Sequence, residues 1–388
     1  MTAAPLPVPH AAAGLKDLAA DARRWLFDSA APLWSTAGRL PNGMLAERLT
    51  RAGVADDAPR RLFVQARHIY AFCTIGRLGW NGPWQAAAGG ALDHLLAHGR
   101  RADGLFIHAF TAAGAVLDAR ADLYDQAFML FCLGHAATAL GRPELLEVAE
   151  RLATVLERDH AHPAGGFIEP DMPGAFRRQN PHMHFLEAFA ALHAHGGGEA
   201  WKVRARALAD LGRDRFMDSA SGAVIEAFTD GLEPAPGLDG TLVEPGHCFE
   251  WAWLLEGLAA EGWPGAELSD RLTAFARAHG IDAARGVAID EVTTAGVVRK
   301  AAARLWPQTE RLKAALARWR RLGTATEADE ARRAYAGLKL YLHMPVPGTW
   351  QDRLDADGTW VEMPTPGSSF YHITCALAEL ADTADGRL

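Results

Sequence analysis

Hydrophobic residues recur along most of this chain at spacings of three and four positions, with polar residues between them. That period places apolar side chains on one face of a helix. Helix starts are also visible, as at Asn180-Pro181, where asparagine suits the cap and proline the first turn. Together these signals predict twelve helices, over residues 15–34, 57–78, 84–97, 122–140, 142–159, 180–192, 199–216, 247–260, 267–279, 305–320, 327–343 and 370–381.

Short segments that begin with glycine and continue with apolar residues separate many of these helices, and they predict short β-strands. Three such strands are expected at residues 104–110, 165–169 and 222–228. Two hairpins are expected, one joining residues 286–290 to 296–298 and one joining residues 348–353 to 358–362. The second hairpin contains Asp357-Gly358, a dipeptide that strongly favours a tight turn.

The even-numbered helices start at nearly regular intervals, which indicates a repeated unit of two helices. Their starts lie near residues 58, 122, 182, 247, 305 and 370, which gives spacings of 64, 60, 65, 58 and 65 residues. A unit of this kind cannot bury its apolar face alone and stacks on its neighbours. Six units can close into a ring with the even helices inside. We therefore expect an all-α (α/α)6 barrel that forms a single domain over residues 1–388.

Composition narrows the possible partners and the compartment. The net charge is −8, which disfavours nucleic acid as a partner. No apolar run reaches the roughly 20 residues of a membrane span, and residues 1–13 lack the pattern of a signal peptide. The four cysteines are far apart, as expected in a reducing, cytoplasmic compartment. The sequence leaves open whether the chain forms a homo-oligomer.

Candidate functional residues gather at the predicted starts of the inner helices. Because these helices run parallel in a ring, their starts should converge on one pocket. Three of the helices bring histidine there, and another brings arginine. The set consists of Phe63, Arg67, Tyr124, Asp125, Asn180, His182, His184, Glu187, His247, Glu250, Trp306, Gln308, Glu310, Tyr371 and His372.

This set suits proton transfer on a sugar. Histidine takes up and releases protons near neutral pH, so two histidines at one carbon suit proton abstraction next to a carbonyl. An arginine and a third histidine can stabilise the enediolate that forms. We expect Glu250, one helical turn after His247, to orient that ring. Phe63, Tyr124 and Trp306 can pack against sugar C–H groups. No cofactor is needed for this chemistry.

Three alternatives compete with proton transfer. A metal site could use His182, His184 and Glu187, but residues two apart on a helix point in nearly opposite directions, so no metal is expected. A glycoside hydrolase would need paired carboxylates. Such carboxylates are available at Glu169, Glu244, Glu250 and Glu310, but that chemistry does not account for the histidines. A purely binding scaffold of helical repeats would not account for the ionisable groups at one end.

Six motifs in order resemble the N-acylglucosamine 2-epimerase superfamily, which includes cellobiose 2-epimerases and mannose isomerases and has an (α/α)6 barrel. They are Arg67-His-Ile-Tyr70, Asp122-Leu-Tyr-Asp125, Asn180-Pro-His-Met-His184, Pro245-Gly-His-Cys-Phe-Glu250, Trp306-Pro-Gln-Thr-Glu310 and Ser369-Phe-Tyr-His372. The resemblance implies that His247 and His372 transfer protons. It also implies that the sugar is surrounded by Arg67, Asn180, Tyr124 and His184, with His184 favoured over His182.

Within the superfamily, the sequence is most similar to the mannose isomerase branch, notably in residues 306–310, 348–358 and 370–373. This resemblance implies conversion of a monosaccharide, D-mannose, into D-fructose through a cis-enediol. His372 would then carry the proton between C2 and C1, and His247 would assist ring opening or move a hydroxyl proton. A 2-epimerase could use the same residues to return the proton to the other face of C2.

The loop over residues 231–246 contains no lysine or arginine, which favours a neutral sugar over a sugar phosphate or sulfonate. Arg177 and Arg178 could still supply positive charge near the site. The sequence does not separate mannose from lyxose, glucose or an N-acyl sugar as the substrate.

Overall fold

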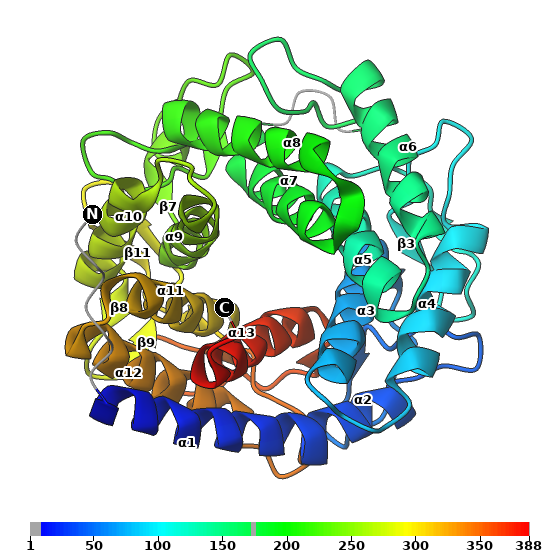
Figure 1. The fold of residues 1–388 in the computed structure, drawn as a ribbon, viewed down its shortest axis with the longest axis horizontal. Helices are drawn as coiled ribbons and strands as arrows, with labels where there is room; N and C mark the ends of the chain where they lie inside the picture. Colours follow the sequence, from blue (N-terminus) through cyan, green and yellow to red (C-terminus); the bar gives the residue numbers. More distant parts are fainter. Residues whose placement is uncertain (1–8, 172–175, 388) are drawn as a thin grey trace.

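The computed structural model describes residues 9–171 and 176–387, and its helices form two concentric rings (Figure 1). Each helix of the inner ring packs against the next, and the last packs against the first, so the ring is closed. The predicted (α/α)6 barrel is confirmed. The inner helices are α3 (Leu62–Arg77), α5 (Leu123–Ala139), α7 (Gln179–Leu192), α9 (Pro245–Ala260), α11 (Trp306–Leu322) and α13 (Ser368–Asp385).

Each inner helix has one outer helix packed on it. Five outer helices follow their inner partners in the sequence: α4 (Trp84–His98), α6 (Glu144–Asp159), α8 (Glu199–Leu211), α10 (Ala266–His279) and α12 (Ala325–Leu342). The sixth, α1 (Pro9–Trp25), precedes the ring in sequence and covers α13, so the two ends of the ring meet there (Figure 1). A strand pair reinforces this closure, because β1 (Arg48–Leu49) pairs with β14 (Thr365–Pro366).

The two rings differ in how their side chains are buried. Outer helix α6 buries a stripe formed by Leu145, Ala149, Leu152 and Leu156, and its remaining face is polar. Inner helix α9 is buried on almost every side, because it has neighbours on both sides and an outer helix behind it. This difference matches the rule that a helix that is apolar all round is a buried one. Among the described residues, no helix is long and apolar enough to cross a membrane.

Two predicted outer or terminal helices are interrupted. The helix expected over residues 15–34 consists of α1, one π-helical turn (Leu26–Ala30) and α2 (Ala31–Thr36). The helix expected over residues 199–216 ends as a π-helical turn (Gly212–Phe216) after α8. A third π-helical turn (His193–Gly197) follows α7.

Strands of two or three residues pin the starts of the inner helices. Five of them lie directly before or within a few residues of an inner helix: β2 (Arg60–Arg61), β5 (Arg177–Arg178), β7 (Leu242–Val243), β12 (Ala303–Arg304) and β14. Their partners come from other loops at the same end, namely β3 (Ala109–Phe110), β6 (Ala227–Phe228), β10 (Glu291–Thr293), β13 (Arg353–Leu354) and β1. β4 (Val116–Asp118) adds a third strand beside β3. The loops thus tie neighbouring helix starts together.

The strand predictions are only partly correct. Residues 104–110 and 222–228 contribute just β3 and β6, and residues 165–169 contribute one isolated bridge at Phe167, because each loop meets its neighbour over only one or two positions. The hairpin predicted between 286–290 and 296–298 is wrong in its pairing. β9 (Val287–Ala288) pairs with the strand before it in the sequence, β8 (Ile281–Asp282), and β10 pairs with the strand after it, β11 (Val298–Lys300). Gly296, with φ of 76°, forms the turn immediately after β10.

Candidate active site

The starts of all six inner helices meet around a cavity of about 210 Å3. Nine of the fifteen candidate functional residues named from the sequence line this cavity, and the other six, Asp125, His182, Glu187, Gln308, Glu310 and Tyr371, do not. The lining consists of Phe63, Arg67, Tyr124, Asn180, His184, Glu244, His247, Glu250, Arg304, Trp306, Ser368 and His372. The convergence inferred from the helix spacing is therefore present in the structure.

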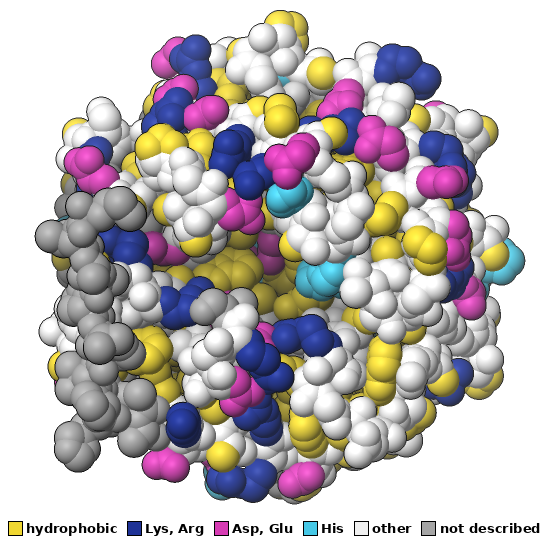
Figure 2. Space-filling model, in the orientation of Figure 1, with side chains coloured by type: hydrophobic (Ala, Val, Ile, Leu, Met, Phe, Trp, Pro, Cys, Tyr) yellow, Lys and Arg dark blue, Asp and Glu magenta, His cyan; other side chains and the backbone are white. Residues whose placement is uncertain are grey.

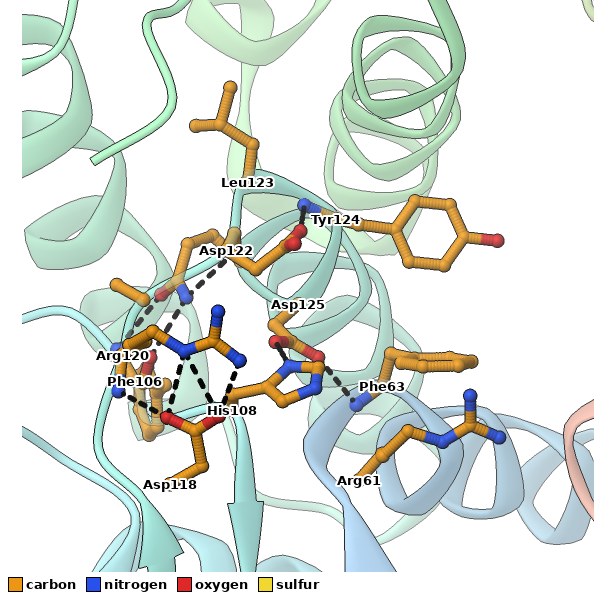
Figure 3. A network of polar contacts seen from close by, with 12 residues as sticks. Arg61, Phe63, Phe106, His108, Asp118, Arg120, Asp122, Leu123, Tyr124 and Asp125 are labelled. Atoms are coloured by element: carbon orange, nitrogen blue, oxygen red, sulfur yellow. Dashed lines mark hydrogen bonds and ion pairs between the residues drawn. The ribbon is translucent and has the colours of Figure 1, made fainter. Parts of the chain in front are cut away.

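A buried carboxylate, Asp125, fixes two of these helix starts relative to each other (Figure 3). It accepts hydrogen bonds from the Phe63 backbone N–H at 3.0 Å and from His108 Nδ1 at 2.7 Å. Asp122 caps the same helix by accepting from the Tyr124 N–H at 2.8 Å. The rings of Phe63 and Tyr124 meet edge to face, 5.2 Å apart, and both line the cavity. This network sets the aromatic wall of the site.

His372, on α13, is held by a carboxylate behind it. Its Nδ1 is 2.8 Å from Oε1 of Glu310, whose side chain has no exposed surface. Burial lowers the pKa of His372 well below 6.5, and the charges of Arg67 and Lys313 act in the same direction. His372 is therefore neutral at neutral pH. With Nδ1–H donated to Glu310, the lone pair of Nε2 is free. Glu310 orients this histidine and does not line the cavity.

His247, on α9, has the opposite electrostatic environment. Its Nδ1 is 2.9 Å from both carboxylate oxygens of Glu226. Burial alone would lower its pKa, but the negative charges of Glu226, Glu244 and Glu250 raise it to about 9. His247 is therefore an imidazolium at neutral pH. His372 and His247, which both line the cavity, therefore differ in charge: His372 is neutral and His247 is protonated.

Glu250 does not orient His247, contrary to the sequence-based expectation, because Glu226 occupies the ring nitrogen. One oxygen of Glu250, Oε1, is buried without a hydrogen-bond partner among the described residues. Burial raises the pKa of Glu250 well above 4.5, and the neighbouring charge of Glu310 adds to the shift. The Glu250 carboxylate belongs to two clusters of side chains that could bind a metal. One cluster contains His184 and Glu187, and the other contains Glu310 and His372.

The two histidines of α7 lie in different environments. His184 lines the cavity, its Nδ1 is 3.0 Å from Glu187, and burial lowers its pKa to about 4 despite that carboxylate. Both ring nitrogens of His182 are bonded to the backbone, Nε2 to the N–H of Phe167 and Nδ1 to the carbonyl of Arg178, each at 2.9 Å. His182 therefore has no free nitrogen to offer to a ligand.

Arg67 is the guanidinium in the lining that contacts no carboxylate among the described residues. It donates to the Tyr124 hydroxyl at 2.6 Å and to the Ser368 carbonyl at 3.1 Å. The other arginine of the lining, Arg304, is paired with Glu244 at 2.6 Å. Arg67 therefore retains positive charge that a bound oxygen anion could use.

Trp306, at the start of α11, contacts both histidines of the proposed pair. Its ring centroid is 4.9 Å from that of His247 and 5.7 Å from that of His372. Asn180 offers a further contact, because its Oδ1 is buried and has no hydrogen-bond partner among the described residues. An aromatic ring face next to an unsatisfied acceptor suits a sugar. The ring can pack against sugar C–H groups, and the acceptor can bind a sugar hydroxyl group.

The sequence matches the N-acylglucosamine 2-epimerase (GlcNAc 2-epimerase) family over residues 43–376. The chain belongs to this family. It is 39% identical to "Mannose-6-phosphate isomerase" of Rhizobium meliloti, over 92% of this chain and 95% of that protein. It is 25% identical to "D-mannose isomerase" of Thermobifida fusca, over 88% of this chain and 95% of that protein. The prediction of a sugar isomerase or epimerase is thereby confirmed at this general level.

Solved structures of family members share the fold. A D-mannose isomerase superposes with a TM-score of 0.85 at 19% identity, covering 94% of this chain and 97% of that one. Cellobiose 2-epimerase of Bacillus thermoamylovorans superposes with a TM-score of 0.84, also at 19% identity, covering 94% of this chain and 98% of that one. At this level of identity the likeness establishes the barrel and carries no information about the substrate.

Three groups of side chains in this family member have the composition of a metal site. They are His184 with Glu187 and Glu250, His247 with Glu226 and Glu244, and His372 with Glu250 and Glu310. In each group one carboxylate already forms a hydrogen bond with the histidine. A metal ion bound at that Nδ1 would have to replace this hydrogen bond, whereas one bound at Nε2 would leave it in place. The expectation of a metal-free enzyme remains a prediction that chelation can test.

Four residues of the site were not assigned to proton transfer or sugar binding from the sequence: Glu226, Glu244, Arg304 and Ser368. Glu244, named there only as a carboxylate available to a hydrolase, and Ser368 stand directly before recognised motifs, so extending each motif by one residue would have included them. Arg304 stands two residues before the motif that begins at Trp306. Glu226 lies next to the short strand β6, in a loop that the helix pattern does not place, and its bond to His247 is seen only in the structure.

Proposed function

We propose that this chain is a cofactor-free aldose–ketose isomerase that interconverts D-mannose and D-fructose as free sugars, with the whole ring serving as one catalytic domain. The observation that carries the proposal is the pair of histidines in opposite protonation states on one cavity. Neutral His372 can accept a proton from carbon, and protonated His247 can donate one to oxygen. The two relatives named as isomerases favour this outcome over epimerisation.

In the proposed reaction, Nε2 of His372 removes the proton from C2 of the open-chain aldose. The electron pair of the C–H bond forms the C1–C2 double bond, and the carbonyl electrons move to O1, which takes a proton from His247. The cis-enediol then loses the O2 proton to His247, and His372 returns its proton to C1. The net change moves one hydrogen from C2 to C1 and one from O2 to O1.

The remaining lining residues suit stabilisation of the enediolate. Arg67 carries charge without a carboxylate partner and is bonded to the Tyr124 hydroxyl, so both can approach the developing negative oxygen. The buried, unpartnered oxygens of Asn180 and Glu250 would accept hydrogen bonds from sugar hydroxyls. Satisfying such atoms on binding is worth more than forming a bond that replaces an existing one.

The charge around the cavity favours a free sugar over a sugar phosphate. A phosphate needs cations that are not already neutralised. Of the two arginines that line the cavity, Arg304 is paired with Glu244, and Arg67 is the one assigned to the developing enediolate oxygen. Arg178, outside the lining, is paired with Glu169 at 2.7 Å. We expect D-mannose to give a higher kcat/KM than D-mannose 6-phosphate. The opposite order would show that the substrate resembles the one in the name of the Rhizobium meliloti relative.

A sugar 2-epimerase is the second candidate, because protonated His247 could also deliver a proton to C2 from the opposite face. Incubation with D-mannose in D2O, followed by NMR, separates the two. Fructose as a product supports the isomerase, and its deuterium content at C1 measures how far the proton held by His372 exchanges with solvent before it returns. Glucose as the sole product supports the epimerase. Release of a monosaccharide from a glycoside, without either reaction, would overturn both in favour of a hydrolase. Activity that is lost in EDTA and restored by a metal would overturn the metal-free mechanism.

A further inference from the structure

Lys313 is a buried cation in the middle of the barrel that does not line the cavity. It lies on α11 one turn after Glu310, and its side chain has no exposed surface. Its ammonium group is 2.6 Å from Oε2 of Glu310 and 3.7 Å from the centre of the Trp253 ring. Burying an amine is costly unless nearby negative charge compensates for it. The neighbours of Lys313 must therefore supply compensating negative charge.

Three buried carboxylates surround this lysine: Glu187, Glu250 and Glu310, which are 4%, 1% and 0% exposed. Burial raises the pKa of Glu250, and the charge of Lys313 opposes that shift. Burial also acts to raise the pKa of Glu187, but His184 and Lys313 lower it overall. Without Lys313, three carboxylates would share a nearly dry space with less compensating charge, and protonation of one or more of them would be favoured.

Glu310 connects Lys313 to the proposed base. Its Oε2 contacts the lysine, and its Oε1 is 2.8 Å from Nδ1 of His372. We propose that Lys313 is a positioning residue of the reaction proposed above: its ammonium group holds Oε2 of Glu310, so that Oε1 faces His372 and accepts the Nδ1 hydrogen, and His372 presents the Nε2 lone pair to the substrate. A protonated Glu310 would donate to Nδ1 instead, and the hydrogen of His372 would then sit on Nε2, where it blocks proton abstraction.

Within residues 9–171 and 176–387, no second cation contacts Glu310. Arg67 lies on the cavity side and contacts Tyr124 and Ser368. The charged and titratable groups that act on Lys313 or His372 from the surrounding helices are Arg67 of α3, His184 and Glu187 of α7, Glu250 of α9, Glu310 of α11 and Cys375 of α13.

The test replaces Lys313 by methionine, which keeps the unbranched chain and removes the charge. We expect Lys313→Met to lower kcat about 10- to 100-fold at neutral pH, as is common when the group that orients a functional histidine is disturbed, with KM changed about twofold or less. The acidic limb of the kcat profile should move to higher pH, because the charge of Lys313 no longer opposes protonation of the buried carboxylates around it, among them Glu250. Activity should recover partly at alkaline pH, which a purely structural defect would not produce.

Arg311→Met is the matched control. Arg311 lies on the same helix and is also buried, with its Nε 2.7 Å from Glu330, but this ion pair faces α12. Its loss should lower the melting temperature comparably and leave kcat and the pH profile unchanged. If Lys313→Met changes stability alone, as Arg311→Met is expected to do, the inference is wrong.

A double-mutant cycle with Glu310→Gln tests the route of the effect. If Lys313 acts through Glu310, the double variant should be no slower than Glu310→Gln alone. Losses that multiply would show that Lys313 does not act through Glu310. The double variant removes both partners of the ion pair and leaves neither charge of that pair behind, so it serves as the folded reference if Lys313→Met alone does not fold.

A measurement without turnover separates this inference from the proposed function. Ring ¹⁵N NMR of His372 should show the hydrogen on Nδ1 in the wild type at neutral pH, and on Nε2 in a substantial fraction of Lys313→Met. An unchanged tautomer overturns the inference even if the wild type isomerises mannose. The expected tautomer shift, in a protein whose wild type converts no sugar, overturns the proposed function and leaves the role of Lys313 intact.

Discussion

The two ends of the barrel each contain a cavity, but they differ in what the cavity leaves unsatisfied. At the helix starts, a cavity of about 210 Å3 contains Asn180 and Glu250 with unpartnered oxygens. At the other end lies a cavity of about 440 Å3 with mainly apolar walls. Figure 2 shows the central hollow with its hydrophobic floor. The charged groups that line the 440 Å3 cavity are paired, as in the ion pair of Arg77 with Asp382 at 2.7 Å.

The comparison teaches that cavity size is a poor guide to the proposed active site, because the smaller cavity, at what we call the reactive end, holds the proposed catalytic residues. In a helix the Cα–Cβ bonds tilt toward the N-terminus, so side chains of the first turn reach beyond the helix start. Six parallel inner helices therefore direct their first-turn side chains into one space. At the opposite end the same tilt draws side chains back onto the helices. Small residues there, such as Ala190, Ala191 and Ala378, leave a wide cavity with mainly apolar walls.

The largest expected effect comes from removing either histidine of the proposed pair. His372→Ala and His247→Ala should each lower kcat about 10³-fold, within the range usual for loss of a general acid or base, without loss of the circular dichroism spectrum or melting temperature. Steady-state kinetics on D-mannose checks this. A near-normal rate in His372→Ala would remove that residue from proton transfer and weaken the contrast between the two ends.

Replacing Glu226 should have a smaller effect with a specific pH signature. Since Glu226 helps to raise the pKa of His247 to about 9, the active, protonated form is lost as pH rises through that value. Glu226→Gln should lower kcat/KM about tenfold at neutral pH and move the alkaline limb down by about one unit. Glu233→Gln, in the next loop and exposed, is the control. An unmoved alkaline limb would contradict the assignment of His247 as the acid.

Asn180→Ala tests whether unsatisfied atoms matter at the reactive end. The loss of one acceptor for a sugar hydroxyl should raise KM about fivefold and lower kcat less, in keeping with the energy of one neutral hydrogen bond. Initial rates over a range of mannose concentrations measure both constants. A fall in kcat with KM unchanged would indicate that Asn180 acts in the transition state and not in binding.

The smallest effect is expected at the opposite end. His195 is close to His135, with a nitrogen–nitrogen distance of 3.0 Å, and burial lowers the pKa of both rings. These histidines have the same side chain as the proposed proton-transfer pair, but neither has a carboxylate partner among the described contacts. His195→Ala should leave kcat/KM within about twofold of the wild type. A loss greater than tenfold would show that the two ends act together.

The helices were predictable because each is long enough for its periodic pattern to outweigh local exceptions. The inner helix starts were predictable from repeat spacing and from residues such as Pro245 and Pro307 in first turns. The strands were not, because a two-residue strand is defined by the loop it meets and not by its own sequence. The hairpin at 286–298 illustrates this, since Gly296 decides where the turn falls.

The site was predictable in its lining but not in its electrostatics. Residues near the helix starts, among them His247 and His372, could be placed by helix geometry alone. The partner of His247 could not, because Glu226 lies in a separate loop. It reaches the start of α9 through the hydrogen bond from its N–H to the Leu242 carbonyl and through the bond that its side chain accepts from the Glu244 N–H. Assigning Glu250 to that role relied on its spacing along one helix, whereas the ring nitrogen faces a loop. Which histidine is neutral follows from charges that only the folded ring brings together.

The way the ring closes also has a consequence for how the protein is made. The outer wall of the last unit, α1, is synthesised first, while the inner helix that it covers, α13, is synthesised more than 340 residues later. A nascent chain that already contains five units is therefore an open arc with an uncovered apolar face on α1. Ring closure must await α13 and the pairing of β1 with β14. Contacts so distant in sequence slow folding and expose intermediates to aggregation, so the nascent arc is where we expect chaperones to act.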